Sequence, residues 1–264
     1  MFSADQRREF ETVGYVRIPH AVDRDVVATM HAHAWELLEA KGYRRDDPAT
    51  WSLPWSPHVG AGMVSKLQNM TSAGQGPESS PAVRAALDAI FDGTPRSEPA
   101  GWGQALVTLP VDAAEWLVPR QIWHFDHLYT QPGEIRGVNV FLLMDDIEPR
   151  GGGTAVVRNS PQLMDRILAE GATFTKLSQQ NRRFLAADEW TRGLKVGADE
   201  WCAERNAAYL GDTVAHGVNV RVEELHGAAG DVFVCHPALA HAPSMNVSDR
   251  PRFMRAQRFF ARGG

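Results

Sequence analysis

Apolar residues in the first hundred positions recur at the three- and four-residue spacing that is typical of helices. A short helix can run over residues 7–12, with Ser3 or Asp5 as its N-terminal cap. Further helices are predicted over residues 23–41 and 80–91. The chain therefore begins with a mainly helical part.

The later chain has a different pattern, in which short apolar runs are separated by Gly and Pro and read as strands. The predicted strands are 15–18, 104–109, 121–125, 137–144, 154–158, 230–235 and 253–260. Two ranges break the pattern: 43–76 is an irregular loop, and 160–228 reads as helical and irregular. A strand-rich half after a helical start favours a β-sandwich decorated with helices.

No repeat, low-complexity tract or linker divides the chain, so we expect a single domain over residues 1–264. Residues 1–100 would form its mainly helical part. The strands of the sandwich would come from 101–159 and 229–262. We expect 160–228 to be an insertion, or lid, over one end of the sandwich.

Composition limits the class of partner. Hydrophobic residues make up 44% of the chain and charged residues 22%, which suits a globular core. The net charge of −5 and the lack of a basic block argue against nucleic acid. No apolar run is long enough to span a membrane, no signal peptide is evident, and two cysteines fit a reducing compartment. We expect a cytoplasmic protein that acts on a small molecule, in an oligomeric state that the sequence leaves open.

His124 and Asp126 are the most informative pair of residues. They are two positions apart on a predicted strand, so both side chains project from the same face. His241 follows a later predicted strand and can supply a third ligand. Two imidazoles and one carboxylate leave open positions on iron(II) for a cosubstrate and dioxygen. Zinc can use the same ligands, so the triad alone does not fix the metal.

Arg252 favours iron with an anionic cosubstrate. It lies eleven residues after His241 on the next predicted strand, and a guanidinium can bind a carboxylate through two parallel hydrogen bonds. Iron(II) with one aspartate carries +1, and 2-oxoglutarate carries −2. One buried arginine would therefore balance the site.

With these residues the sequence resembles the phytanoyl-CoA dioxygenase (PhyH) family. The resemblance rests on His124-Phe125-Asp126, on the turn Gly151–Thr154, and on the stretch from Gly230-Asp231 through His241 and Asn246 to Arg252, with support from Phe10–Val16. It covers most of the chain apart from 43–76 and 160–228. It implies a mainly β fold with flanking helices, the double-stranded β-helix or cupin-like jelly roll, and iron(II) and 2-oxoglutarate as cofactors.

The resemblance also implies roles for single residues. His124, Asp126 and His241 would bind iron, and Arg252 would hold the far carboxylate of 2-oxoglutarate. Relatives often carry a hydroxyl residue where this chain has Pro243, so another hydroxyl would have to assist Arg252. The candidate cofactor-binding residues besides Arg252 are Thr154, Ser244 and Gln121. Relatives that halogenate lack the aspartate, so Asp126 favours hydroxylation.

Two of these assignments have rivals nearby. His236 precedes His241 by five residues and competes with it as the third ligand. The offsets to Asn246 and Arg252 favour His241. Arg250 has the same strand parity as Arg252 and competes with it as the anchor of the cosubstrate.

The substrate side is less defined. Trp55 and Gln68 in the 43–76 loop could line a substrate pocket, and His127 could face it. Each could instead be a loop anchor or a surface residue, and the same holds for Trp51 and Trp102. The chain shows no basic patch for coenzyme A, so a small or medium organic metabolite is favoured.

These observations predict an iron(II)- and 2-oxoglutarate-dependent oxygenase that oxidises a C–H bond. A cupin-like metal enzyme without 2-oxoglutarate would not need Arg252. A non-catalytic jelly-roll binding protein would be expected to lack a ligand, and all three ligand residues are present.

Overall fold

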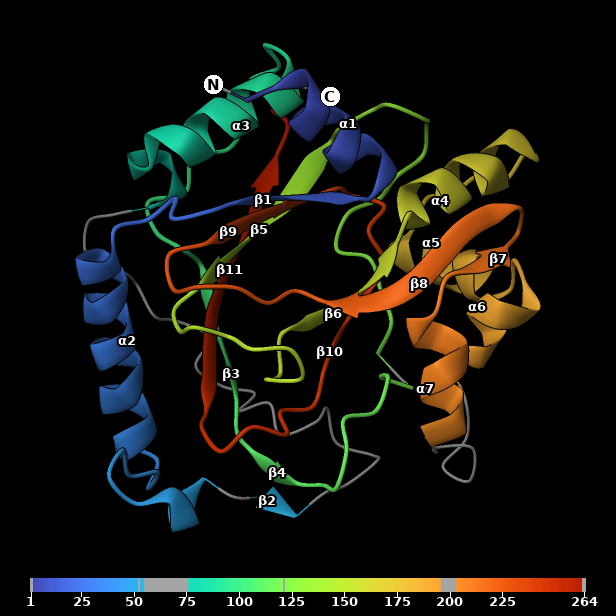
Figure 1. The fold of residues 1–264 in the computed structure, drawn as a ribbon. Helices are drawn as coiled ribbons and strands as arrows, with labels where there is room; N and C mark the ends of the chain where they lie inside the picture. The colour runs from blue at the N-terminus through green and yellow to red at the C-terminus, as the bar shows by residue number, and fades with distance from the viewer. Residues whose placement is uncertain (1, 52, 55–75, 121, 196–202, 263–264) are drawn as a thin grey trace.

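The fold is mainly β, with two antiparallel sheets and helices on their outer faces, as predicted (Figure 1). The computed structural model describes residues 2–51, 53–54, 76–120, 122–195 and 203–262. The helices are α1 (Ala4–Thr12), α2 (Arg24–Glu39), α3 (Pro81–Phe91), α4 (Ser160–Ala169), α5 (Leu177–Leu185), α6 (Glu189–Gly193) and α7 (Ala203–Leu210), with 3-10 turns at Pro48–Thr50 and Pro77–Ser79. None of the described helices is long and apolar enough to cross a membrane.

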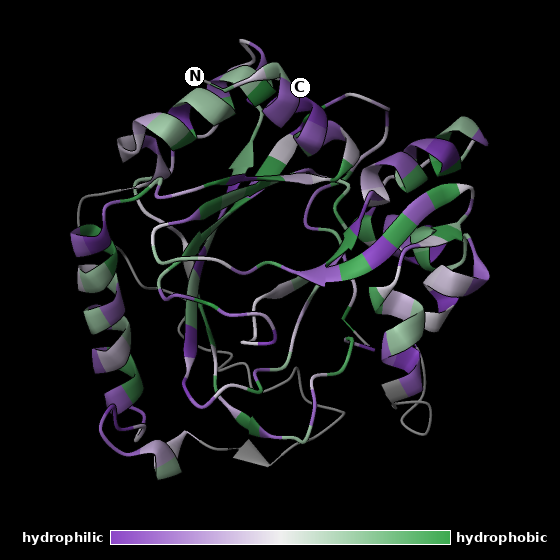
Figure 2. Cartoon of the chain, in the orientation of Figure 1, coloured by the Kyte–Doolittle hydropathy of each residue, from purple (hydrophilic) through white to green (hydrophobic). Residues whose placement is uncertain are grey.

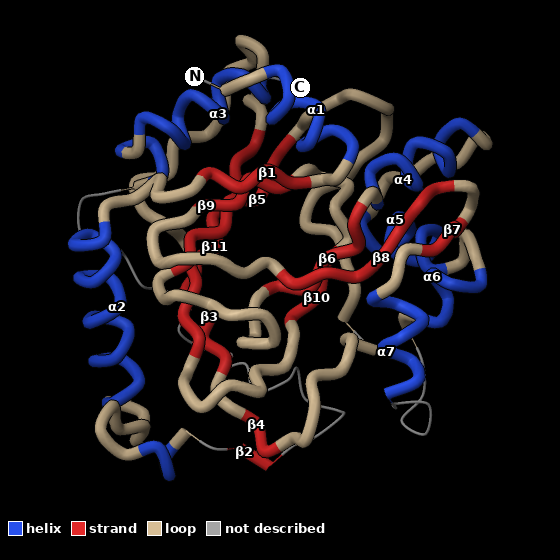
Figure 3. The backbone as a smooth tube through the Cα atoms, viewed as in Figure 1, coloured by secondary structure: helices blue, strands red, loops and turns tan. Residues whose placement is uncertain are grey.

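The strands are distributed over the whole chain. They are β1 (Tyr15–Ile18), β2 (Leu53–Pro54), β3 (Gln104–Thr108), β4 (Val111–Asp112), β5 (Gly137–Leu143), β6 (Thr154–Arg158), β7 (Thr213–Ala215), β8 (Val218–Glu224), β9 (Val232–Cys235), β10 (His241–Pro243) and β11 (Arg252–Phe260). One sheet has the order β1-β9-β5-β11-β3 and the other β10-β6-β8-β7, while β2 and β4 form a short parallel pair (Figure 3).

The N-terminal helices begin where the sequence provides a capping side chain. Ser3 and Gln6 form a reciprocal capping box at α1, and Ser80 accepts a hydrogen bond from the Val83 amide at α3. On α2, apolar residues at helical spacing are buried on one face, and Figure 2 shows hydrophobic and hydrophilic residues alternating along this helix. These helices cover the outer face of the five-stranded sheet.

A separate apolar cluster fills the space between the two sheets. It joins Phe141 of β5, Phe233 of β9 and Met254 of β11 to Val156 of β6. The outer face of the four-stranded sheet carries a third cluster, which packs against α4 and α5. The inner faces of the two sheets are thus fixed relative to one another, and the candidate ligands lie on elements at this inner surface.

Two predictions about the strands were wrong in detail. The range 160–228, predicted as a helical insertion, contains helices only up to residue 210, and β7 and β8 extend the four-stranded sheet. Strand β8 forms because Val218, Val220 and Val222 alternate with more polar residues, so that all three valines are buried on one face. In the described part of the predicted strand 121–125, residues 122–125, strand pairing is reduced to one bridge at His124.

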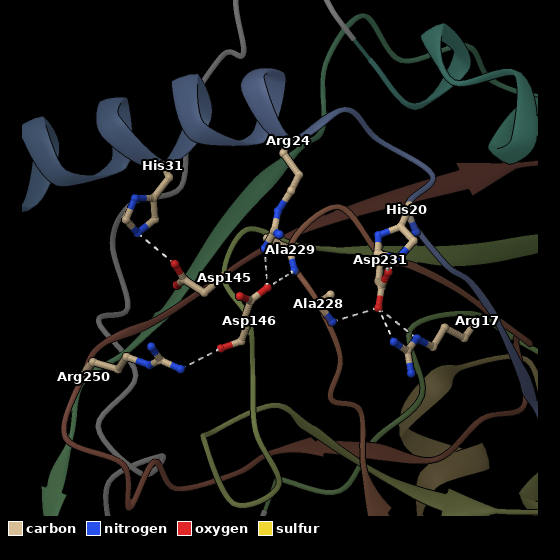
Figure 4. Close-up of polar contacts among 10 residues, drawn as sticks. All are labelled: Arg17, His20, Arg24, His31, Asp145, Asp146, Ala228, Ala229, Asp231 and Arg250. Carbon is tan, nitrogen blue, oxygen red and sulfur yellow. Dashed lines mark hydrogen bonds and ion pairs between the residues drawn. The ribbon is translucent and has the colours of Figure 1, made fainter.

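Asp231 ties the N-terminal segment to the turn before β9 (Figure 4). Its carboxylate is fully buried and accepts hydrogen bonds from the Arg17 guanidinium, the His20 amide and the Ala228 amide. The neighbouring Asp146, which is half-exposed, accepts from Arg24 and the Ala229 amide. Asp231, in the Gly-Asp pair noted in the sequence, therefore connects β1 and the residues after it to the turn that precedes β9.

Replacing Asp231 with alanine should lower the free energy of unfolding by about 1–3 kcal/mol, because the Arg17 guanidinium and the His20 and Ala228 amides lose the acceptor that they share. Urea denaturation at neutral pH measures this. Asp146→Ala is the control and should cost less, because its carboxylate is exposed to solvent. Equal losses in the two variants would contradict the role given to Asp231.

Candidate metal centre

The structure brings His124, Asp126 and His241 together at the inner surface of the sandwich. One ligand atom from each residue lies within 4.8 Å of the other two. The Asp126 carboxylate is 3.7 Å from His124 Nε2 and 3.4 Å from His241 Nε2. The His124 side chain is 34% exposed, whereas those of Asp126 and His241 are largely buried, so the centre is reachable from one side.

Backbone pairing places the two histidines side by side. His124 and His241 form an antiparallel bridge in which each amide donates to the other's carbonyl at 3.0 Å. Their imidazole centroids are 4.3 Å apart. A short strand pair therefore positions two ligands from segments more than a hundred residues apart in the sequence.

Both imidazole rings are oriented by backbone carbonyls. His124 Nδ1 lies 2.7 Å from the Ile122 carbonyl, and His241 Nδ1 lies 3.0 Å from the Leu239 carbonyl. Donation from Nδ1 fixes the tautomer and leaves each Nε2 lone pair for a metal. Ile122 has a φ of +64°, which is unusual for a β-branched residue and turns its carbonyl toward the ring.

Asp126 is held from two neighbouring strands. Arg258 of β11 donates to Oδ1 at 2.5 Å, and Asn139 of β5 donates to Oδ2 at 2.7 Å. Burial opposes ionisation of Asp126, but the hydrogen bond and charge of His241, together with the charges of Arg258 and His124, hold its pKa well below the ordinary value. Burial, and then the nearby His241, lowers the pKa of His124. A carboxylate and neutral imidazoles are the forms that bind a metal.

His127 does not belong to the ligand cluster but is linked to Asp126 through Asn139. It is buried, and its Nε2 is 3.1 Å from the Asn139 Oδ1. Its ring also contacts Phe260. The structure thus places His127, a candidate for the substrate pocket, in a chain that runs through Asn139 to Asp126.

Helix α5 clamps the segment that carries the ligands. Asn181 accepts a hydrogen bond from the Phe125 amide. Gln180 accepts from the Tyr129 amide and donates to the His127 carbonyl. The helical region between β6 and β7 therefore contributes directly to the position of the His-Asp pair.

Arg252 is buried at the start of β11. It donates to the carbonyls of Gly152 and Leu106 and, at 2.5 Å, to the Thr108 hydroxyl. Burial lowers its pKa to about 10, so it remains protonated at neutral pH. Strand register explains the Thr108 contact, because Arg252 pairs with Thr108 across β11 and β3.

The two hydroxyl residues expected near Arg252, Ser244 and Thr154, have other contacts in the structure. Ser244 donates to the Gly153 carbonyl and lies 2.6 Å from a Glu224 carboxylate oxygen. Burial raises the pKa of Glu224, and the hydrogen bond from Ser244 opposes this shift. Thr154 is buried beside Pro243 in the β6–β10 pair. Both residues lie near the Arg252 end of the site, but Thr108 is the hydroxyl that Arg252 contacts.

The rival residues lie elsewhere. His236 is buried between the rings of Phe10 and Tyr129, and burial lowers its pKa to about 3. Arg250 is exposed and donates to the Asp146 carbonyl. Trp51 and Trp102 are buried in the apolar core that also contains residues of α2 and α3. Gln121, Trp55 and Gln68 lie outside the described residues.

Three residues at the site were missed by sequence reasoning: Asn139, Arg258 and Thr108. Each belongs to a strand predicted from its apolar pattern, and its role follows from pairing between strands. Asn139 is the register partner of Arg258, which places both donors beside Asp126. An asparagine within the buried strand β5 was the available signal, since buried polar groups need partners.

The chain belongs to the phytanoyl-CoA dioxygenase (PhyH) family, whose model matches residues 10–254. This confirms the prediction made from the motifs. The family and the three-ligand site agree with the iron(II) and 2-oxoglutarate that the sequence predicts. No curated protein sequence matches the chain.

Solved structures share the fold. AviO1 from Streptomyces viridochromogenes Tue57 is 17% identical, with a TM-score of 0.50 over 99% of this chain and 96% of that chain. The epimerase SnoN from nogalamycin biosynthesis, in complex with Fe3+, α-ketoglutarate (2-oxoglutarate) and nogalamycin RO, is 16% identical, with a TM-score of 0.50 over 97% of this chain and 82% of that chain. At these identities the likeness shows the fold alone.

Asn139→Ala should weaken iron(II) binding about 10- to 100-fold, because Asp126 loses the amide donor that orients its Oδ2. An anaerobic iron(II) titration measures the affinity. Asn219→Ala on the exposed side of β8 is the matched control and should bind as wild type does. If Asn139→Ala also binds like wild type, Asn139 does not support the metal centre.

Proposed function

We propose that this protein is a non-haem iron(II)- and 2-oxoglutarate-dependent oxygenase that hydroxylates, or otherwise oxidises, a C–H bond of a small or medium organic metabolite. The observation that carries the proposal is the His124-Asp126-His241 cluster, in which both imidazole Nε2 atoms and the carboxylate converge. Family membership favours iron over zinc at this ligand set.

Arg252 supports 2-oxoglutarate as the cosubstrate. Its contacts within the described residues use three of its five N–H groups and leave one on each terminal nitrogen. Two such groups can bind a carboxylate in bidentate fashion. Arg252 and Arg258 have the same parity on β11, so both face the space between the sheets, where Arg258 contacts Asp126.

The charges are consistent with this assignment. Iron(II), Asp126 and Arg252 together carry +2, and 2-oxoglutarate carries −2. A buried arginine without a nearby anion would destabilise the fold. When 2-oxoglutarate is absent, the charge of Glu224 compensates that of Arg252. A cupin-like enzyme that does not use 2-oxoglutarate would have no need of this buried cation.

Bound iron(II) with 2-oxoglutarate supplies the activation of dioxygen, with succinate and carbon dioxide as co-products. The chain itself supplies geometry. The carbonyls of Ile122 and Leu239 hold the histidine rings, while Asn139 and Arg258 hold the carboxylate as an anion. The apolar cluster between the sheets, which includes Phe141 beside His241, keeps water from the inner side of the centre.

The proposed cosubstrate is tested by adding iron(II) and then 2-oxoglutarate without oxygen and recording the visible spectrum. We expect a metal-to-ligand charge-transfer band in the wild type. Arg252→Gln should need about 10- to 100-fold more 2-oxoglutarate, because charge-assisted hydrogen bonds to the far carboxylate are lost. Arg250→Gln removes an exposed arginine two residues away and should behave as wild type does.

Iron(II) affinity measured in the same variants separates a local effect from misfolding. If the wild type binds iron(II) but forms no band with 2-oxoglutarate, the cosubstrate assignment fails. The cupin-like reading would then take its place. Equal 2-oxoglutarate requirements in Arg252→Gln and Arg250→Gln would remove Arg252 from the site.

A further inference from the structure

A groove of about 800 Å³ begins at the two residues that precede the candidate ligand His124. Ile122, which is 53% exposed, and Trp123 form its edge on the ligand segment. One face of α5 forms its wall, with Ser178, Asn181 and Leu185 at helical spacing. Since Asn181 also accepts a hydrogen bond from the Phe125 amide, the groove adjoins the metal centre.

Among the described residues, three cationic side chains line this groove, and no carboxylate does. They are Arg182 of α5, Arg192 of α6 and Lys195, and all three are exposed. Among the described residues, Arg182 and Lys195 form no ion pair, while the charge of Arg192 acts on Asp188. The adjacent Arg183, in contrast, points elsewhere and pairs with Glu170 at 3.0 Å.

This grouping is local, because the chain as a whole carries a net charge of −5. The three cations are separated by ten and three positions, so they form no basic block from which a basic surface could be predicted in the sequence. Folding of α5 and α6 brings them around one cavity. The expectation from the sequence that the chain lacks a basic patch was therefore wrong for this surface.

We propose that the groove binds an anionic group, phosphate or carboxylate, of the organic substrate, and that Arg182 and Arg192 are its main contacts. This rests on the proposed function and narrows its substrate class to organic anions. Leu185 and the Trp123–Ile122 edge supply apolar surface for the carbon skeleton next to the charged group. Like charges that line one groove repel one another, and a bound anion would relieve this repulsion.

The test uses phenyl phosphate and phenylacetate as probes, each titrated calorimetrically into the iron(II)- and 2-oxoglutarate-loaded protein without oxygen. Saturating 2-oxoglutarate keeps the probes from the Arg252 site. The double variant Arg182→Gln/Arg192→Gln should bind the preferred probe about tenfold more weakly than wild type, and added salt should weaken wild-type binding. Arg183→Gln is the matched control and should bind as wild type does.

Preference for phenyl phosphate would identify a phosphate-bearing substrate, and preference for phenylacetate a carboxylate. Binding of neither probe to the wild type, or equal binding by the double variant and Arg183→Gln, would overturn the proposal.

The charge-transfer band is recorded in the same samples. If it persists in the double variant while probe binding is lost, the groove acts separately from the cosubstrate site. If it is absent from the wild type, the proposed function fails, whatever the groove binds.

Discussion

The reciprocal backbone hydrogen bonds between His124 and His241 are the constraint on which the site depends. They join the segment after residue 122 to the start of β10 and thereby align the two imidazoles. Asp126 follows His124 by two residues and is held beside them by Asn139 and Arg258. The rest of the sandwich supports this bridge. The clusters on both sides of the four-stranded sheet fix β10 through its pairing with β6.

Charge is the second determinant of the site. Asp126 is largely buried and accepts hydrogen bonds from Asn139 and Arg258, which face each other across β5 and β11. At the other end of β11, Arg252 is buried among carbonyls and the Thr108 hydroxyl. One strand therefore supplies both the cation beside the candidate metal ligand and the cation that we propose for the cosubstrate.

Much of the fold and the ligand set could be predicted from sequence, because both depend on local spacing. The two-residue offset of His124 and Asp126, and the apolar runs of β1, β5 and β6, are visible without a structure. Pairing is not local. That Thr108 faces Arg252, and that Asn139 faces Arg258, depends on the register of strands far apart in the chain. The alternation in β8 was present in the sequence but lay within a range dominated by helical segments. The basic groove needed the folded arrangement of α5 and α6.

We propose that His124, Asp126 and His241 hold iron. The decisive measurement is anomalous diffraction at the iron absorption edge, from crystals grown without oxygen in iron(II) and 2-oxoglutarate. We expect one strong peak within bonding distance of His124 Nε2, His241 Nε2 and an Asp126 oxygen, with 2-oxoglutarate reaching from it to Arg252. A crystal with no peak between these three side chains, or with iron bound at another histidine such as His236, would contradict it.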